Sequence, residues 1–168
     1  MYMNHEQAEK IIFWTFGSLS SAGWGKLRSA FWFQIAGLLL ILIQWRDVNL
    51  LSQGDDSARS LGLVPGRARV RLLLSASFVT AITVSVTGII GFAGLMVPHV
   101  IRMISGPDHR SLLPLSVLGG ALFLMLADMV GRVLLSPAEL PVGVITSMLG
   151  APYLLYILIS RRRRGDFR

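Results

Sequence analysis

Four long stretches with almost no charge constrain this sequence more than any other feature. They cover residues 30–45, 72–101, 112–131 and 140–160, and the single acidic or basic side chain within them is Asp128. A helix needs about 20 apolar residues to cross a bilayer core, and about 17 suffice at the short end. A chain of 168 residues has too little polar surface to bury four such helices in water. Because alternation with a period of two is absent, the sequence predicts an all-α, polytopic membrane protein.

The composition agrees with a lipid environment. Apolar residues make up 53% of the chain and charged residues only 15%, against about 25% charged in typical soluble domains. Such a composition excludes a disordered chain, which has few apolar residues and a high net charge. Cysteine is absent, which excludes disulfides, thiolate nucleophiles and cysteine-ligated metal sites.

The stretch over residues 72–101 is too long for one crossing. Its middle holds Gly88, Gly91 and Gly94, followed by Pro98. Glycine and proline at this density break a helix or allow close packing. We therefore expect a span over residues 72–90, a reversal near Gly91 and a short returning helix that ends near Arg102.

The placement of the basic residues tests this reversal. With it, the chain makes about five passes and begins outside, and 12 of the 16 Lys and Arg residues lie inside. A single crossing over residues 72–101 would leave only 6 inside. The positive-inside rule therefore favours five passes. Short interfacial segments are expected at Glu6–Leu19 and at 137–141, and an odd number of passes from an outside start suggests that spans are missing upstream.

Residues 49–66 form an inner loop, here called the coupling loop, that predicts a short helix. Asp55 and Asp56 would lie in its first turn, where the helix dipole favours anions, and Gly62 is a natural C-terminal cap. Such a helix can dock into a groove on a soluble partner or lie at the lipid headgroups. The pattern alone favours the headgroups.

Five motifs give the chain a family resemblance. They cover residues 88–102, 106–114, 127–132, 137–146 and 150–152, and together they resemble the membrane permeases of ABC importers for iron–siderophores, haem and vitamin B12. The segment Asp56-Ser57-Ala58 resembles the family's Glu-Ala-Ala coupling motif. The resemblance covers essentially the whole chain but only the C-terminal half of a ten-helix permease. It implies a fragment, a truncated reading frame or one part of a split permease.

The resemblance implies a set of partners in the bacterial cytoplasmic membrane. They are a dimer of cytoplasmic ATPase subunits, an extracytoplasmic substrate-binding protein, a second permease copy or homologous chain, and the missing N-terminal half. No cofactor and no nucleic acid are expected. The basic tail, residues 161–168, would anchor the chain at anionic lipid headgroups. Contact with the ATPase would fall on the coupling loop, at Asp55, Asp56, Ser57, Ala58, Arg59, Leu61 and Gly62.

Other charged and small residues receive roles from the same resemblance. Arg132, at the outer end of its span, would pair with a carboxylate of the binding protein. Asp128 lies four residues earlier, which is the spacing of a local ion pair on a helix. Six residues would line the pathway or allow close helix packing, namely Gly91, Gly94, Pro98, Gly143, Thr146 and Gly150.

Several alternatives remain beside an importer of an iron chelate. The substrate can be cobalamin or haem, because the motifs are shared. The chain can be a non-functional remnant. A third alternative is an intramembrane metal-dependent enzyme that uses His99, Asp108 and His109, although their spacing matches no known ligand motif.

Overall fold

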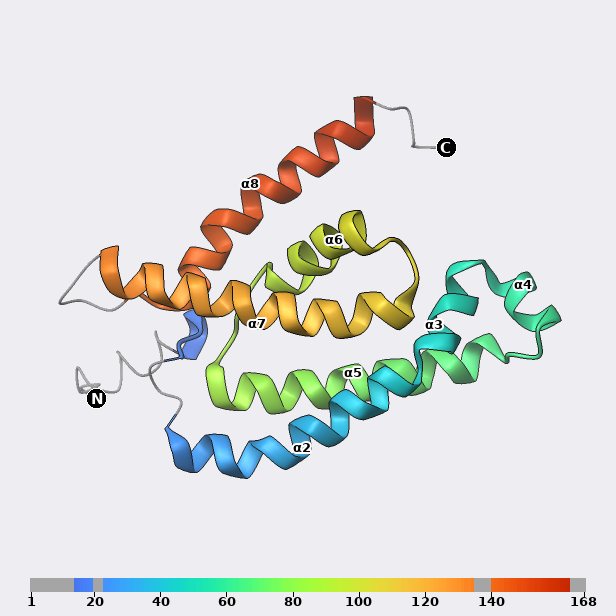
Figure 1. The fold of residues 1–168 in the computed structure, drawn as a ribbon, viewed down its shortest axis with the longest axis horizontal. Helices are drawn as coiled ribbons and strands as arrows, with labels where there is room; N and C mark the ends of the chain where they lie inside the picture. Colours follow the sequence, from blue (N-terminus) through green and yellow to red (C-terminus); the bar gives the residue numbers. More distant parts are fainter. Residues whose placement is uncertain (1–13, 20–22, 135–139, 164–168) are drawn as a thin grey trace, which may run out of the picture.

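The computed structural model describes residues 14–19, 23–134 and 140–163, and all regular structure in these ranges is helical. The predicted all-α class is therefore confirmed. The helices are shown in Figure 1: α2 (Trp24–Ile43), α3 (Trp45–Ser52), α4 (Asp55–Ser60), α5 (Pro65–Thr87), α6 (Ala93–Ser105), α7 (His109–Leu134) and α8 (Val142–Arg163). Most of the expected interfacial segments, residues 6–13 and 137–139, and the end of the basic tail lie outside the described ranges.

Four helices, α2, α5, α7 and α8, are long and apolar enough to cross a membrane. They coincide with the predicted spans but begin or end several residues beyond the uncharged stretches. In α5 the extension starts at Pro65, a residue whose fixed φ suits the first helical position. The helix then continues through Arg67, Arg69 and Arg71, because nothing in that segment interrupts the backbone hydrogen bonds.

The predicted reversal after α5 is present. Helix α5 ends at Thr87, and the turn uses left-handed backbone at Gly88 (φ 73°) and Phe92 (φ 62°). Helix α6 then runs back for 13 residues, about 20 Å at 1.5 Å per residue. This length is shorter than the bilayer core of about 30 Å, so α6 makes the return pass without reaching the full thickness by itself.

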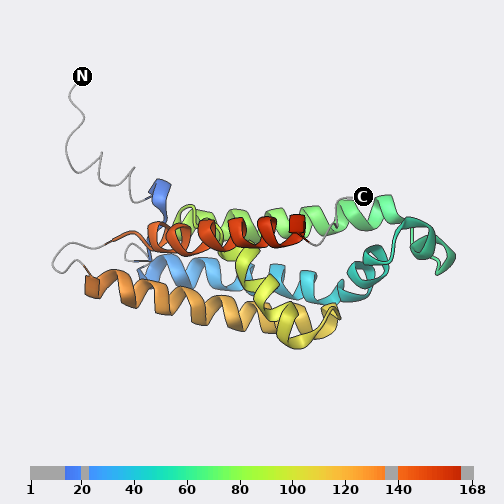
Figure 2. The same ribbon diagram turned by 90° about the horizontal axis from the view of Figure 1, so that it is seen from above.

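Helices α2, α5, α6, α7 and α8 run alternately in opposite directions, so α5 and α7, which are separated by α6, run the same way (Figures 1 and 2). One end of the molecule, here called the coupling-loop end, carries α3, α4, the start of α5 and the turn between α6 and α7. The other, here called the Gly143 end, carries residues 14–19, the turn after α5, the end of α7 and the start of α8. This order is the one that the five-pass prediction requires.

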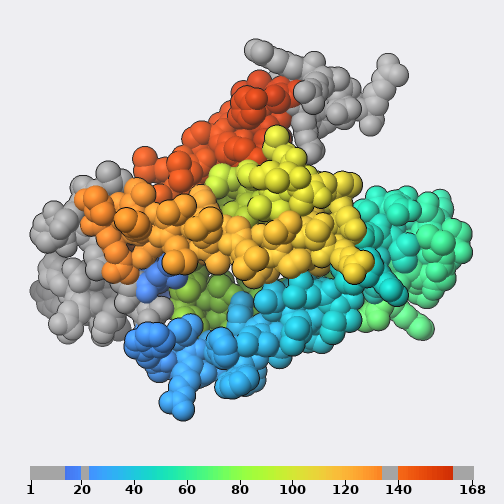
Figure 3. Space-filling view, viewed as in Figure 1, coloured from blue at the N-terminus to red at the C-terminus, as the bar shows by residue number. Residues whose placement is uncertain are grey.

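Few of the described side chains along the long helices are buried, and many large apolar ones are exposed; Figure 3 shows the face of the molecule that carries α2 and α7. A buried cluster of Ala127, Val142 and Ile145 lies at the Gly143 end. Helices α2 and α5 are joined by hydrogen bonds from Gln34 Nε2 to Thr83 Oγ1 (3.1 Å) and from Gln44 Nε2 to Ser75 Oγ (2.9 Å). Polar bridges of this kind hold helices together in lipid, where burial of apolar surface gives no driving force.

Candidate functional site

Helix α4, in the coupling loop, has both ends fixed by its own backbone. Gly54 precedes it with φ 100°, and Asp55 and Asp56 lie in its first turn, as predicted. Gly62 follows with φ 83°. The Gly62 N–H donates to the carbonyl of Arg59 (2.9 Å), and the Leu63 N–H donates to that of Ala58 (2.9 Å). These two bonds form a Schellman motif, so the prediction that Gly62 caps this helix is confirmed.

One side of α4 is fastened to α5. The guanidinium of Arg69 holds the Asp55 carboxylate with two hydrogen bonds, of 2.6 and 3.1 Å, the bidentate arrangement that arginine favours. Ala58 of α4 and Ala68 of α5 are both completely buried. Asp55 and Ala58 therefore hold the helix in place.

The opposite side of α4 is open to solvent. Asp56 and Arg59 are exposed, and Leu61 at the helix end is 63% exposed. Ser57 is half-buried between the two sides. The residues predicted to contact an ATPase thus divide into an inner set that positions α4 and an outer set that a partner can reach.

Helix α3 is separate from α2, a division that the pattern of apolar residues did not predict. Arg71 Nη2 of α5 binds Asp47 Oδ2 at 2.9 Å. Farther along α3, Asn49 Nδ2 donates to Asp108 Oδ1 (2.7 Å), and the backbone N–H of His109 donates to Asn49 Oδ1 (2.9 Å). The last two contacts join segments 59 and 60 residues apart, which no local pattern reveals.

Asp108 lies in the turn between α6 and α7. The backbone N–H of Arg110 and the amide of Asn49 both donate to its carboxylate, and these hydrogen bonds hold the pKa of Asp108 below its usual range. The carboxylate is therefore charged at neutral pH and remains an acceptor for Asn49.

In the ranges that the structure describes, no three His, Asp or Glu residues lie close enough together to hold a metal ion. The ligand set that an intramembrane metal-dependent enzyme would need is therefore not found among these residues. Both ring nitrogens of His109 already have partners, since Nδ1 lies 2.7 Å from Asn49 Oδ1 and Nε2 lies 3.2 Å from Arg102 Nη2. The ring of His99 instead faces Tyr153 edge-on, with ring centroids 6.0 Å apart.

At the Gly143 end, Arg132 Nε forms an ion pair with Asp128 Oδ2 at 2.8 Å. This is the local i, i+4 pair that the spacing predicted. The Arg132 side chain is 51% exposed, and ion pairs of this kind contribute about 0–1 kcal/mol. The pair therefore fixes the direction of the guanidinium more than it stabilises the fold. A contact with a binding protein stays a prediction.

In α8, the residues predicted to line the pathway or to allow close helix packing are closely packed against other segments. A Cβ at Gly143 would collide with the carbonyl of Phe16, and one at Gly150 would collide with the side chain of Phe92. Thr146 is fully buried, and its hydroxyl donates to the carbonyl of Gly143 (3.1 Å).

The predicted pathway or packing residues before and within α6 are less closely packed than those of α8. A Cβ on Gly91 would meet only Ser147 Oγ, at 3.5 Å, and one on Gly94 would meet nothing within 4 Å. Pro98 lies inside α6 and is half-buried.

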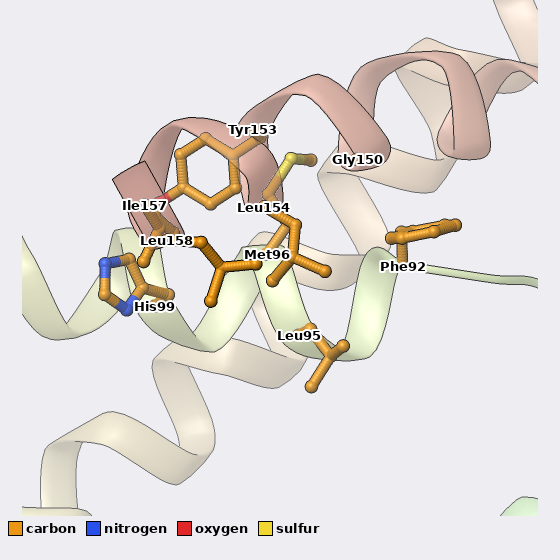
Figure 4. Close-up of a pocket in the computed structure, with 9 residues that line it drawn as sticks. All are labelled: Phe92, Leu95, Met96, His99, Gly150, Tyr153, Leu154, Ile157 and Leu158. Carbon is orange, nitrogen blue, oxygen red and sulfur yellow. The ribbon is translucent and has the colours of Figure 1, made fainter. Parts of the chain in front are cut away.

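An apolar groove of about 230 Å³ separates α6 from α8 (Figure 4). His99 lies near one end of it and Phe92 near the other, and Tyr153 extends from α8 across the groove. The hydroxyl of Tyr153 is buried without a hydrogen-bond partner.

Comparisons with known proteins place this geometry in a family. A model of the FecCD transport family matches residues 1–160. The hemin transport system permease protein of Yersinia pestis is 44% identical over 95% of this chain and 48% of its own length. The Fe(3+) dicitrate transport system permease protein of Escherichia coli is 40% identical over 96% of this chain and 51% of its own.

Two further relatives extend the comparison. The cobalamin import system permease protein of Halobacterium salinarum is 42% identical over 92% of this chain and 41% of its own. A solved structure of an inward-facing metal-chelate type ABC transporter matches 96% of this chain and 52% of its own, with a TM-score of 0.82 and 35% identity. The chain thus spans about half the length of the relatives that it matches.

Proposed function

The chain belongs to the FecCD transport family, and from this premise we propose that it acts as the C-terminal half of the permease of an ATP-binding-cassette importer in the bacterial cytoplasmic membrane. The observation that carries the proposal is the match of nearly the whole chain to half of a metal-chelate type ABC transporter, at a TM-score of 0.82. In this role the chain forms part of the route for the substrate, and a partner subunit hydrolyses ATP.

The coupling loop would receive the ATPase dimer. Asp56, Arg59 and Leu61 present an exposed surface with charges of both signs beside an apolar side chain. Because Asp55 and Ala58 fasten the inner side of α4 to α5, a displacement of α4 would also displace α5. Rigid-body movement of this kind changes access to the pathway without deforming the packed helices.

Arg132 would meet a carboxylate on the binding protein at the Gly143 end. The pair with Asp128 holds the guanidinium in one direction through Nε. A planar donor held in one direction suits the bidentate binding of a carboxylate.

The proposed substrate is an iron chelate. The relatives are named for hemin, Fe(3+) dicitrate and cobalamin, with identities of 44%, 40% and 42%. Identity therefore does not separate these substrates, and haem and cobalamin are the alternatives. In such a system the binding protein can set specificity through its own differences in affinity.

A complete importer would also contain the complementary N-terminal half and a second permease unit. The coverage supports the first of these, since each relative described above has roughly twice the matched length, and membership of the family supports the second.

The test is reconstitution in proteoliposomes of this chain with its complementary half, ATPase and binding protein. Uptake of iron(III) dicitrate, haem and cobalamin would be measured side by side with ATP hydrolysis. We expect uptake of the iron chelate and stimulated hydrolysis. Preferred uptake of haem or cobalamin would reassign the substrate, and no uptake of any of them would favour the remnant.

Matched charge reversals test the two ends of the molecule. Arg59→Glu on the open side of α4 should remove the stimulation of the ATPase. Arg28→Glu, near the start of α2 at the other end, reverses an equally exposed charge and should leave the stimulation intact. Equal effects of the two variants would contradict docking at α4.

A further inference from the structure

The coupling loop is fastened to the membrane helices in two separate places. One attachment leads to α5 through Asp55 and Arg69, with Asp47 and Arg71 beside it. The other leads to the turn between α6 and α7, and its hydrogen bonds converge on Asn49, the first residue of the loop. The proposed function uses the first attachment and leaves the second without a role.

The contacts of Asn49 require an amide. Its Nδ2 donates to the carboxylate of Asp108, while its Oδ1 accepts from the backbone N–H of His109. An aspartate at this position would place two carboxylates against each other, and a leucine could neither donate nor accept. Only a side chain with a donor and an acceptor satisfies both partners.

The same amide sets the state of the His109 ring. Because Asn49 Oδ1 is an acceptor, His109 Nδ1, 2.7 Å away, must carry its hydrogen. In the neutral ring Nε2 is then an acceptor, and Arg102 Nη2 lies 3.2 Å from it. The hydrogen bonds thus continue from α3, through the first residue of α7, to the last turn of α6.

Burial makes this path stiff. His109 is only 9% exposed, and buried hydrogen-bond networks rigidify the groups that they join. A second contact reinforces the joint, because the guanidinium of Arg110 lies 5.8 Å from the centre of the Trp45 ring on α3. Displacement of α3 is therefore transmitted to the start of α7.

Helix α6 is the element that can move when α3 and the start of α7 are displaced. It has 13 residues, of which only Val97 is buried, and it is followed by Gly106 with φ 82°. Toward α8 it borders the apolar groove shown in Figure 4 rather than a filled core. A force applied at Arg102 meets little resistance on that side.

We propose that Asn49 is a positioning residue that transmits movement of the coupling loop to α6, through His109 and Arg102, and thereby couples ATP hydrolysis to substrate movement. The proposal rests on the proposed importer function. Movement of the coupling loop would then reach two helices, α5 through Asp55 and α6 through Asn49.

The test measures substrate transported per ATP hydrolysed in the reconstituted importer. Asn49→Asp should lower this ratio about 2- to 30-fold, if the ratio follows the change in coupling free energy that mutations along a coupling path produce. Binding of the ATPase to the permease should not change, because the open side of α4 is untouched. The matched control is Gln34→Leu, which removes an interhelical hydrogen bond between α2 and α5 and should leave the ratio intact.

Exchange of the two partners provides a rescue. In the double variant Asn49→Asp with Asp108→Asn, the new amide donates to the new carboxylate, which still accepts from the backbone N–H of His109, and the new amide must turn so that its oxygen keeps the hydrogen bond from the Arg110 N–H. We expect this variant to regain most of the lost ratio. Recovery on exchange would show that the contact between residues 49 and 108 carries the effect, and the distance measurement below separates coupling from a merely structural role. Should Asn49→Asp fail to assemble, Asn49→Leu, which has neither a donor nor an acceptor, replaces it as the single variant in the same comparison.

The movement of α6 relative to α8 can be followed by measuring a distance between the two helices. The chain has no cysteine, so spin labels can be placed at single new cysteines on exposed Met103 of α6 and exposed Leu155 of α8. We expect the distance between the labels to shift when a non-hydrolysable ATP analogue binds the wild-type importer. The shift should be lost in Asn49→Asp and should return in the exchanged pair.

The possible results separate the two proposals. If the wild-type importer takes up none of iron(III) dicitrate, haem and cobalamin, the proposed function fails. If wild-type uptake is normal and Asn49→Asp keeps both the transport ratio and the distance shift, the role of Asn49 is overturned while the importer function stands.

Discussion

Gly143 lies where three backbone segments meet, so a single methyl group added there should destabilise the protein. A Cβ at this position would collide with the Phe16 carbonyl and come within 3.2 Å of the Ile89 carbonyl oxygen. Overpacking usually costs about 1–3 kcal/mol, and the upper end applies because backbone atoms cannot rotate away. The better helix propensity of alanine returns up to about 1 kcal/mol. We therefore expect Gly143→Ala to lose about 2 kcal/mol of stability.

Gly94 provides the matched control. Like Gly143 it is the second residue of an apolar helix, but an added Cβ would meet nothing within 4 Å. Gly94→Ala should therefore gain about 0.5–1 kcal/mol from propensity alone. The two variants should differ by about 3 kcal/mol, which corresponds to about 6–12 °C in melting temperature for a chain of this size.

The assay is thermal unfolding of the purified chain in detergent micelles, followed by circular dichroism, with wild type and both variants measured together. A melting temperature of Gly143→Ala equal to or above that of Gly94→Ala would refute the packing argument. It would mean that the start of α8 has free space, as a residue that lines a pathway requires.

Three other substitutions test individual contacts. Gly62→Ala forces a side chain into φ 83° at a cost of about 1–2 kcal/mol, so hydrogen exchange of the α4 amides should accelerate by about 5- to 30-fold if all of that cost falls on α4. Arg69→Lys replaces the bidentate contact with Asp55 by a point charge, and it should loosen α4 in the same measurement by a smaller factor, with the melting temperature almost unchanged. Asp128→Asn removes the charge that orients Arg132 and should change stability by less than about 1 kcal/mol, because the pair is half-exposed. If Arg132 docks the binding protein, the same variant should weaken that binding in a titration of the reconstituted permease, and an unchanged affinity would contradict the orienting role.

The features that could be predicted from sequence all depend on neighbouring residues. A span can be predicted from about 20 consecutive apolar residues, and a helix end can be predicted from a glycine that follows the helix. The Asp128–Arg132 pair can be predicted from its spacing of four residues. The reversal between α5 and α6 belongs to the same class. The residues that form the turn could not be predicted in the same way, because the positive φ angles fall on Gly88 and Phe92 rather than on Gly91.

Phe92 shows why the turn could not be assigned in detail. A side chain in the left-handed region costs about 1–2 kcal/mol, so a sequence pattern places glycine there. In the folded chain the Phe92 side chain lies against Gly150 of α8, where any Cβ would collide with it. The conformation of Phe92 and the absence of a side chain at Gly150 therefore form one packing solution, distributed over two helices 58 positions apart.

Asn49 was missed for the same physical reason. Its residue type suits many loop positions, and for Asp108 and His109 the sequence favours loop hydrogen bonds over metal binding without indicating which partners they have. Hydrogen bonding decides between these roles, since the ring nitrogens of His109 are occupied by Asn49 and Arg102. Contacts across 60 residues depend on how α3 meets α7, which follows from packing that a single sequence does not record.

The two ends of the molecule differ in the kind of contact that holds them, and this difference bears on how the helices can move. At the Gly143 end, backbone lies on backbone, because added Cβ atoms on Gly17, Gly88 and Gly143 would all collide with main-chain atoms. Such contacts have no side-chain rotamers through which to adjust. At the coupling-loop end, the ion pairs of Arg69 and Arg71 join α4 and α3 to α5, and these solvent-accessible pairs can exchange partners with water. A rigid rotation of the helices would therefore turn about the Gly143 end and spread its displacement over the coupling-loop end. Amide hydrogen exchange should accordingly be slower at residues 87–89 and 143–146 than at residues 49–62, and the reverse order would place the pivot elsewhere.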